Sequence, residues 1–242
     1  MTALLLIAHG SRDPRHAATV AALVDRVRAQ RPGLDVATAY LDHCAPRIPQ
    51  VVGRLGAAVA VPLLLNRAFH AKHDIPAALR AAGAGLPVAD VLGPSPLLLA
   101  ALDRRLAGAG LDVASAAVRA RTGVVLAAAG SSDPAADAAT RAVAAEWRRT
   151  RGWAAVEVAY AAGTGPRVPE ALAALHAAGA ARTAVSPYLL APGRLPDRIA
   201  EAATEADLCA DVLGAAPELA TLLLERYDEA LRTSRAIPAL TA

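Results

Sequence analysis

The segment LLLIAHGSRDP, residues 4–14, decides the fold that we expect, and the chain repeats its frame further on as VVLAAAGSSDP, residues 124–134. In both copies a continuous apolar run predicts a strand buried on both faces. A Gly-Ser turn and an Asp-Pro pair then lead into a helical pattern. His9 of the first copy is replaced by Ala129 in the second. The chain therefore contains two versions of one unit that can be compared directly.

Strands alternate with helices throughout the first half. We expect strands at 3–8, 35–41, 57–65 and 88–93, and helices at 16–30, 47–56, 74–83 and 95–110. This alternation predicts right-handed βαβ crossovers and a parallel sheet with helices on both faces. The fold class is therefore α/β with a doubly wound parallel sheet.

The second half keeps the same order of elements. Residues 156–175 match 36–55, and VLGAAPEL at 212–219 matches VLGPSPLL at 91–98. Matches in the same order indicate duplication. We predict two lobes, residues 1–112 and residues 122–242.

The composition restricts the possible partners. Hydrophobic residues make up 55% of the 242 residues, enough for a core in each lobe. Aromatic residues are only 3%, too few for platforms that stack nucleic-acid bases. The net charge of +3 is carried almost entirely by arginine, because Lys72 is the single lysine. Arginine binds carboxylates and phosphates, so the charge fits an acidic small molecule or no special partner, and it is too weak and too dispersed to indicate nucleic acid.

The cysteine content and the apolar runs indicate a compartment. Cys44 and Cys209 lie in different halves and form no CxxC motif, which is typical of the reducing cytoplasm. The apolar N-terminal run is too short and lacks the basic residues of a signal peptide. No apolar stretch reaches the ~18 residues of a membrane span. We expect a cytoplasmic protein with no membrane partner.

Polar side chains follow three of the predicted strands in the first lobe. His9 follows the first strand, Asp42 and His43 follow the second, and His70 follows the third. Ligands bind beyond the carboxyl ends of parallel strands, so these residues should meet at one edge of the sheet. Imidazole and carboxylate groups ligate first-row metals and accept protons. The pattern predicts a metal-binding or proton-transfer site.

The repeat serves as an internal control for this site. His9 corresponds to Ala129 and Asp42 to Ala162, and no histidine lies opposite His70. The framework is kept in both copies, as these pairs show: Gly10 and Gly130, Asp13 and Asp133, Pro14 and Pro134, Tyr40 and Tyr160, Arg47 and Arg167. We therefore predict one working site in the first lobe and a supporting second lobe.

Three cations surround the same edge: Arg12, Arg67 and Lys72. Arg12 and Lys72 are replaced by uncharged residues in the second copy, and Arg67 falls opposite Pro192. Together they would hold an anionic ligand near the histidines.

The remaining histidines are weaker candidates. His73 is a second-line site residue, as is His43, which strand alternation would turn away from Asp42. His16 and His176 lie on predicted helices and are expected at the surface. Asp74 has a counterpart in Asp197 and is expected at a helix start.

Ser11 offers a different chemistry, because a serine beside His9 suggests a hydrolase or transferase. The structural interpretation is stronger, since a serine before a helix is usually an N-cap and Ser131 repeats it in the lobe without the histidines. GxSxG, a P-loop and a strand-linked GxGxxG are all missing from the sequence.

Two stretches resemble a known family. LLLIAHGSRDP and VPLLLNRAFHAKHDIP, residues 61–76, are similar to the signatures of sirohydrochlorin chelatases of the cobalt/iron type, in their long two-domain form. The resemblance implies the class II chelatase fold, two α/β lobes around a cleft. It also implies an ATP-independent lyase that inserts Fe²⁺ or Co²⁺ into sirohydrochlorin, a tetrapyrrole polycarboxylate, in siroheme or cobalamin biosynthesis. No organic cofactor is implied. Two fused lobes are self-sufficient, so we expect a monomer.

The family's site residues carry over to matching positions only. The resemblance makes His9 and His70 the metal ligands and the bases that remove pyrrole protons. It makes Asp42 the acidic residue of the site, where the family usually has glutamate. Ala68 stands where the family commonly has glycine. Iron, cobalt and nickel are not distinguished, and a non-catalytic metal or tetrapyrrole carrier on the same fold is the alternative.

Overall fold

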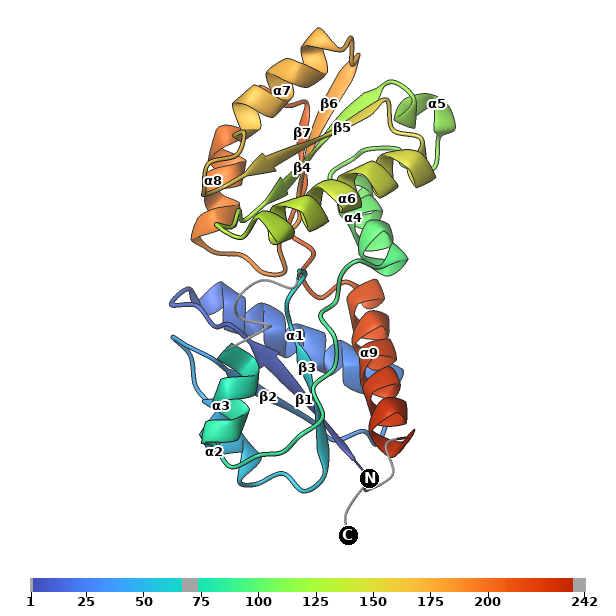
Figure 1. Ribbon diagram of the computed structural model, residues 1–242. Coiled ribbons are helices and arrows are strands. Elements are labelled where there is room, and N and C mark those ends of the chain that lie inside the picture. The colour runs from blue at the N-terminus through green and yellow to red at the C-terminus, as the bar shows by residue number, and fades with distance from the viewer. Residues whose placement is uncertain (1, 67–73, 237–242) are drawn as a thin grey trace. The chain divides into compact units, whose positions relative to one another are not determined.

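The computed structural model describes residues 2–66 and 74–236 (Figure 1). The chain forms two compact units. The first contains the described residues up to Ser95 and from Ala215 onward, and the second is Pro96–Gly214.

The first unit is built on a three-stranded parallel sheet with the order β2-β1-β3. Its strands are β1 (Ala3–Ala8), β2 (Val36–Tyr40) and β3 (Ala58–Pro62), and its helices are α1 (Pro14–Gln30), α2 (Ile48–Val52), α3 (Ile75–Ala81) and α9 (Pro217–Ala236). All six residues of β1 are buried. The parallel pairing confirms the predicted α/β class.

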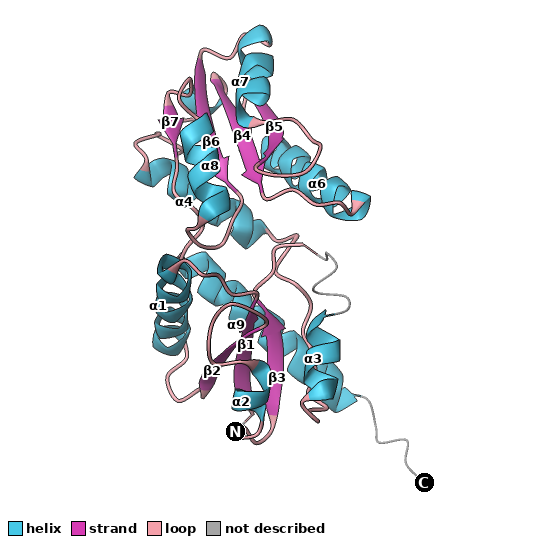
Figure 2. Cartoon of the chain, turned by 90° about the vertical axis from the view of Figure 1, so that its left-hand side faces the viewer, coloured by secondary structure: helices cyan, strands magenta, loops and turns pink. Residues whose placement is uncertain are grey.

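Alternation along β1 supplies both faces of this sheet with apolar side chains. Leu5 and Ile7 join a cluster with Ile48 of α2 and Ile75 of α3. The residues between them in the strand point to the opposite face, where α1 packs along α9 and α9 contacts β3. Figure 2 shows the two helical layers on either side of the strands. The continuous apolar run in the sequence follows from this double cover.

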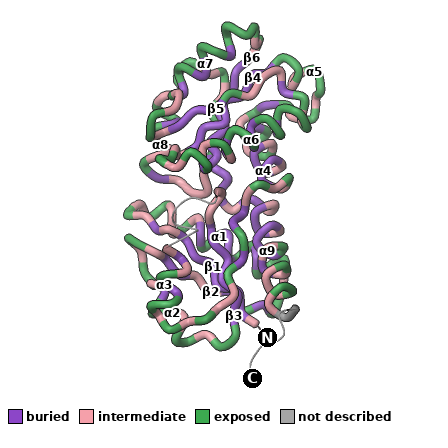
Figure 3. The backbone as a smooth tube through the Cα atoms, viewed as in Figure 1, coloured by how far each residue is buried: buried purple, intermediate pink, exposed green. Residues whose placement is uncertain are grey.

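The second unit repeats the plan with an added edge strand, in the order β5-β4-β6-β7. Its strands are β4 (Thr122–Ala128), β5 (Ala155–Tyr160), β6 (Arg182–Pro187) and β7 (Leu208–Cys209). Its helices are α4 (Pro96–Gly108), α5 (Ala116–Arg119), α6 (Pro134–Arg151), α7 (Val168–Ala177) and α8 (Arg194–Ala202). Residues of α7 and α8 pack with β4 and β6 in one core, and α6 contacts β5. In Figure 3 the central strands of both units are buried.

The compact units divide the chain differently from the sequence repeats. The predicted lobes, 1–112 and 122–242, describe the duplication, whereas packing assigns α4 to the second unit and α9 to the first. The guanidinium of Arg31 binds both carboxylate oxygens of Asp228 at 2.6 and 2.7 Å, and the Tyr227 hydroxyl donates to the carbonyl of Thr2 at 2.6 Å. Each repeat thus gives its last helix to the sheet of the other.

One local expectation was wrong. The segment 88–93 forms a single bridge, between Val88 and Ala60, and no further strand. The Asp90 carboxylate accepts the N–H of Val91 at 2.7 Å, which takes that donor out of any ladder. The short helix α5 lies between the two predicted lobes. Among the described residues, no helix has the length and apolar character that crossing a membrane requires.

Gly10 controls how the loops after β1 and β2 meet. Its φ is +93°, and a Cβ there would collide with the backbone carbonyl of Asp42. Gly130, with φ +89°, meets the carbonyl of Ala162 in the same way. Both conditions exclude a side chain, which explains why the glycine occurs in both copies.

We predict that Gly10→Ala lowers the free energy of unfolding by at least about 3 kcal/mol, because backbone strain and the collision add. Gly33→Ala is the matched control, since Gly33 has φ +84° with nothing within 4 Å of a Cβ; it should cost about 1 kcal/mol. Urea unfolding followed by circular dichroism measures both. Equal losses would contradict the close approach at Gly10.

Candidate functional site

The ends of β1 and β2 are joined beyond the sheet by backbone hydrogen bonds. Leu41 N–H donates to Ala8 at 2.9 Å, and Asp42 N–H donates to the carbonyl of His9 at 2.8 Å. These bonds bring His9 and Asp42 together as the sequence predicted. Main-chain hydrogen bonds therefore hold the segments after β1 and β2 together at the carboxyl edge of the first sheet.

His43 also lies at this edge of the sheet, beside His9. Its φ of 61° is unusual for a residue with a side chain, and its ring lies 6.1 Å from that of His9, nearly perpendicular at 83°. Strand alternation had suggested that His43 turns away. That expectation was wrong, because the chain has left the extended conformation of β2 at this residue.

The Asp42 carboxylate is held in its charged form. Its Oδ1 accepts the N–H of His43 at 2.8 Å and a guanidinium N–H of Arg47 at 2.9 Å. These two bonds lower the pKa of Asp42 below its ordinary value. The other oxygen, Oδ2, lies 3.6 Å from Nε2 of His43. Asp42 is thus a carboxylate at neutral pH, suited to stabilise a positive charge and not to donate a proton.

Arg47 has a structural role that both units share and a role that only the first unit has. It precedes α2, its N–H donates to the side chain of Gln50 at 2.6 Å, and its guanidinium also binds the carbonyl of Leu41. Arg167 also binds a carbonyl at the end of its strand, that of Tyr160, at 2.9 Å. The bond to a carboxylate is the addition in the first unit.

We predict that Arg47→Ala raises the pKa of Asp42 toward the ordinary aspartate value of about 3.9, because one of two donors to Oδ1 is lost. NMR titration of the carboxyl carbon measures this. Arg167→Ala removes the corresponding arginine from the second unit and should leave the Asp42 titration unchanged. An unaltered Asp42 pKa in Arg47→Ala would show that the guanidinium bond has no electrostatic effect.

His16 was expected at the surface, and the structure corrects this. It lies on the first turn of α1, half-buried, with its ring 6.3 Å from that of Tyr40. Its buried Nδ1 has no hydrogen-bond partner among the described residues. Burial, and then the proximity of His9, lower the pKa of His16. The repeat held the signal that was missed, since the corresponding residue is Ala136.

We predict that His16 makes stability depend on pH. Its folded pKa lies below the unfolded value, so the unfolded chain binds the proton first as the pH falls. The contribution of the neutral imidazole is present above the unfolded pKa and is lost as the pH falls through the folded pKa. His16→Ala should flatten the dependence of the unfolding midpoint on pH between 8 and 5. Equal slopes in wild type and His16→Ala would refute the assignment.

Ser11 has a structural role different from the expected N-cap. Asp13 caps α1, with its carboxylate accepting the N–H of Arg15 at 2.9 Å. The hydroxyl oxygen of Ser11 accepts the N–H of Asp13 at 3.1 Å, and Ser131 repeats this with Asp133 at 3.0 Å. The bond thus forms in both units, with or without a neighbouring histidine.

The other predicted site residues are placed as follows. Arg12 is exposed in the loop between β1 and α1. Asp74 directly precedes α3, as expected for a helix start. Arg67, His70, Lys72 and His73 lie outside the described residues. The pairing of His9 with His70 therefore stays a prediction. Within the described ranges, no group of three His, Cys, Asp or Glu side chains lies close enough together to hold a metal ion.

Comparisons with known proteins agree with the architecture of two similar α/β repeats. The sequence model of the CbiX family matches residues 3–109 and 123–230, ranges that correspond to the two repeats. The chain belongs to the CbiX family.

Individual relatives are similar over nearly the whole chain. The sirohydrochlorin cobaltochelatase of Priestia megaterium is 27% identical, over 96% of this chain and 80% of that protein. The sirohydrochlorin ferrochelatase of the same organism is 29% identical, over 83% and 77%. The structure of SirB from Bacillus subtilis with Fe³⁺ superposes with a TM-score of 0.80 over 97% and 98% of the two chains, at 23% identity. The latter likeness shows a shared fold.

Proposed function

We propose that this protein is a sirohydrochlorin chelatase, an ATP-independent lyase that inserts Fe²⁺ or Co²⁺ into the macrocycle. The observation that carries the proposal is the group of His9, His43 and charged Asp42 at the carboxyl edge of the first sheet. The second unit keeps the frame and has alanine at the positions of His9 and Asp42. Membership of the CbiX family and the activities for which the two Priestia relatives are named support the same reaction.

Metal insertion exchanges two pyrrole N–H protons for one divalent ion. His9 and His70 ligate the incoming ion as neutral imidazoles and, as the ion passes to the macrocycle, each accepts one of the two pyrrole protons. Neutral imidazole is suited to both tasks near pH 7. Asp42, charged and fixed by Arg47, stabilises the imidazolium that forms. The metal ion is a substrate here, and no organic cofactor takes part.

The eight carboxylates that the family's substrate carries require cations at the edge of the site. Arg12 is exposed on the loop that follows His9, and we assign Arg67 and Lys72 to the same task. Guanidinium groups bind carboxylates with two parallel hydrogen bonds. We further propose that the protein acts as a cytoplasmic monomer in siroheme or cobalamin biosynthesis.

We predict that His9→Ala slows metal insertion by on the order of 10²-fold or more, as expected for loss of a general base. The assay is the absorbance change of sirohydrochlorin under anaerobic conditions with Co²⁺ or Fe²⁺, and the ratio of the two rates gives the metal preference. Ala129 occupies the corresponding position in the second unit, so alanine fits this frame. His176→Ala, at an exposed histidine of the second unit, should keep the full rate.

Two outcomes would replace this proposal. Wild-type protein that binds sirohydrochlorin tightly without accelerating insertion would be a carrier. Loss of activity in Ser11→Ala, with His9→Ala unaffected, would contradict the chelatase mechanism and favour a nucleophilic serine.

A further inference from the structure

His43 occupies a backbone position that favours glycine. Its φ is +61°, in the left-handed region where a Cβ is disfavoured. The second repeat shows what the frame alone requires, because the corresponding residue there is Gly163, with φ +81°. The first unit therefore carries an imidazole where a glycine would fit with less strain. A side chain at a strained position beside a site is a candidate for function.

The turn that presents His43 is fixed on both sides. The N–H of Cys44 donates to the carbonyl of Asp42 at 2.7 Å, which closes a three-residue turn with His43 at its centre. The thiol of Cys44 makes two bonds to the backbone of Ser11, accepting its N–H at 3.3 Å and donating to its carbonyl at 2.9 Å. Because Ser11 follows His9 by two residues, the loop that carries His43 is tied to the loop that carries His9.

The imidazoles of His9 and His43 are separated by a distance that one metal ion can span. Their ring centroids lie 6.1 Å apart, and the ring planes meet at 83°. A first-row divalent ion binds an imidazole nitrogen at about 2.1 Å. With that bond length and the size of the ring, two imidazoles on one ion have centroids about 4.5 to 6.5 Å apart. The observed separation lies within this range.

Asp42 gives His43 the kind of partner that metal-bound histidines usually have. Arg47 bonds to Oδ1 of this carboxylate at 2.9 Å, and Oδ2 lies 3.6 Å from Nε2 of His43. This separation is too long for a hydrogen bond, but the negative charge favours the tautomer with its proton on Nε2. Nδ1 then keeps its lone pair for a metal ion. The His43 side chain is 35% exposed, so an ion can reach it from solvent.

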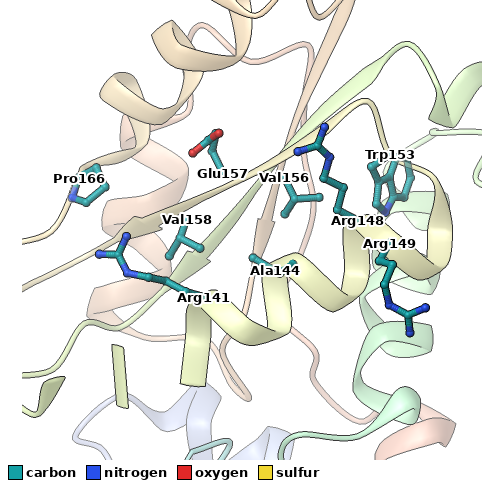
Figure 4. A pocket seen from close by; sticks show the side chains of 10 residues that line it. Arg141, Ala144, Arg148, Arg149, Trp153, Val156, Glu157, Val158 and Pro166 are labelled. Atoms are coloured by element: carbon teal, nitrogen blue, oxygen red, sulfur yellow. The ribbon is translucent and has the colours of Figure 1, made fainter. Parts of the chain in front are cut away.

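The hollow between α6 and β5 of the second unit, shown in Figure 4, lacks ligands of this kind. Among the described residues that line it, Glu157 is the only carboxylate, and no histidine or cysteine occurs. Its cations Arg141 and Arg149 are already paired with carboxylates of α6, at 2.9 and 2.8 Å. An incoming ion therefore finds no imidazole or thiol there, in contrast to the carboxyl edge of the first sheet.

We infer that His43 is a ligand for the incoming divalent ion, which it binds together with His9 at the carboxyl edge of the first sheet. The inference rests on the proposed function, in which His9 already ligates the ion, and it adds a residue that the second repeat replaces with glycine. Imidazole ligands select ions such as Fe²⁺, Co²⁺ and Ni²⁺ over Mg²⁺ and Ca²⁺. Two imidazoles leave other coordination positions of the ion open, which suits an ion that must be passed on.

The probe for this assignment is Co²⁺ alone, with no tetrapyrrole present. Full-length protein is titrated with Co²⁺, and the visible ligand-field absorbance gives the dissociation constant. His43→Gly is the decisive variant, since Gly163 shows that the frame accepts glycine at this position. It should lower the Co²⁺ affinity at least about tenfold, the smaller loss found for residues that only support a metal ligand. The urea midpoint of unfolding should not fall, because the backbone strain is relieved.

Two further variants and a competing ion fix the interpretation. His9→Ala should also lower the Co²⁺ affinity, since it removes the other imidazole of the pair. His176→Ala, at an exposed histidine of the second unit, should bind Co²⁺ as wild type does. Excess Mg²⁺ should not displace Co²⁺ from wild type; displacement would contradict ligation by imidazole.

Binding of Co²⁺ is measured without turnover, so the ligand assignment and the chelatase proposal can fail separately. Equal Co²⁺ affinity in wild type and His43→Gly would overturn the assignment of His43, whatever the insertion rate of either protein. Absence of Co²⁺ binding by wild type would do the same. If His43→Gly lowers the affinity and wild type does not accelerate insertion into sirohydrochlorin, the assignment of His43 stands and the chelatase proposal fails.

Discussion

The contact between Gly10 and the carbonyl of Asp42 is the constraint on which the site depends. Only a glycine lets the loop after β1 pass this close to the loop after β2. The same approach allows the backbone bond from Asp42 to His9, at 2.8 Å. The imidazole and the carboxylate are therefore positioned by main-chain geometry. Gly130 makes the same contact in the second unit, where alanine occupies the positions of His9 and Asp42. The backbone arrangement therefore forms without the side chains of the proposed site.

The duplicated frame therefore carries different side chains in its two copies. The first unit has the imidazoles and the charged Asp42 at the carboxyl edge of its sheet. In the second unit, alanine occupies the positions of His9 and Asp42. Exchange of α4 and α9 means that neither repeat is a complete unit by its own sequence. Loss of one repeat would expose the core of the other.

Sequence reasoning reached candidate site residues only where a local pattern carries the information. His9 and Asp42 became candidates because each follows a predicted strand, and the repeat showed which residues the frame does not need. His43 was misplaced because its orientation depends on a positive φ, which strand alternation does not anticipate. His16 was assigned to the surface because helical periodicity does not report that the ring of Tyr40 lies 6.3 Å away. The sequence did indicate that His16 is not part of the shared frame, because the second repeat has Ala136 at the same position.

The sequence by itself determined the class of the fold, the duplication and the first-unit location of His9 and Asp42, because apolar runs, turn residues and repeats are local properties of the chain. Tertiary structure decided the exchange of the final helices, since the bonds from α9 to Arg31 and Thr2 join residues nearly the whole chain apart. It also decided that the backbone N–H of His43 and the guanidinium of Arg47 both donate to the Asp42 carboxylate and lower its pKa. That depends on which donors meet in space, and no local pattern records it.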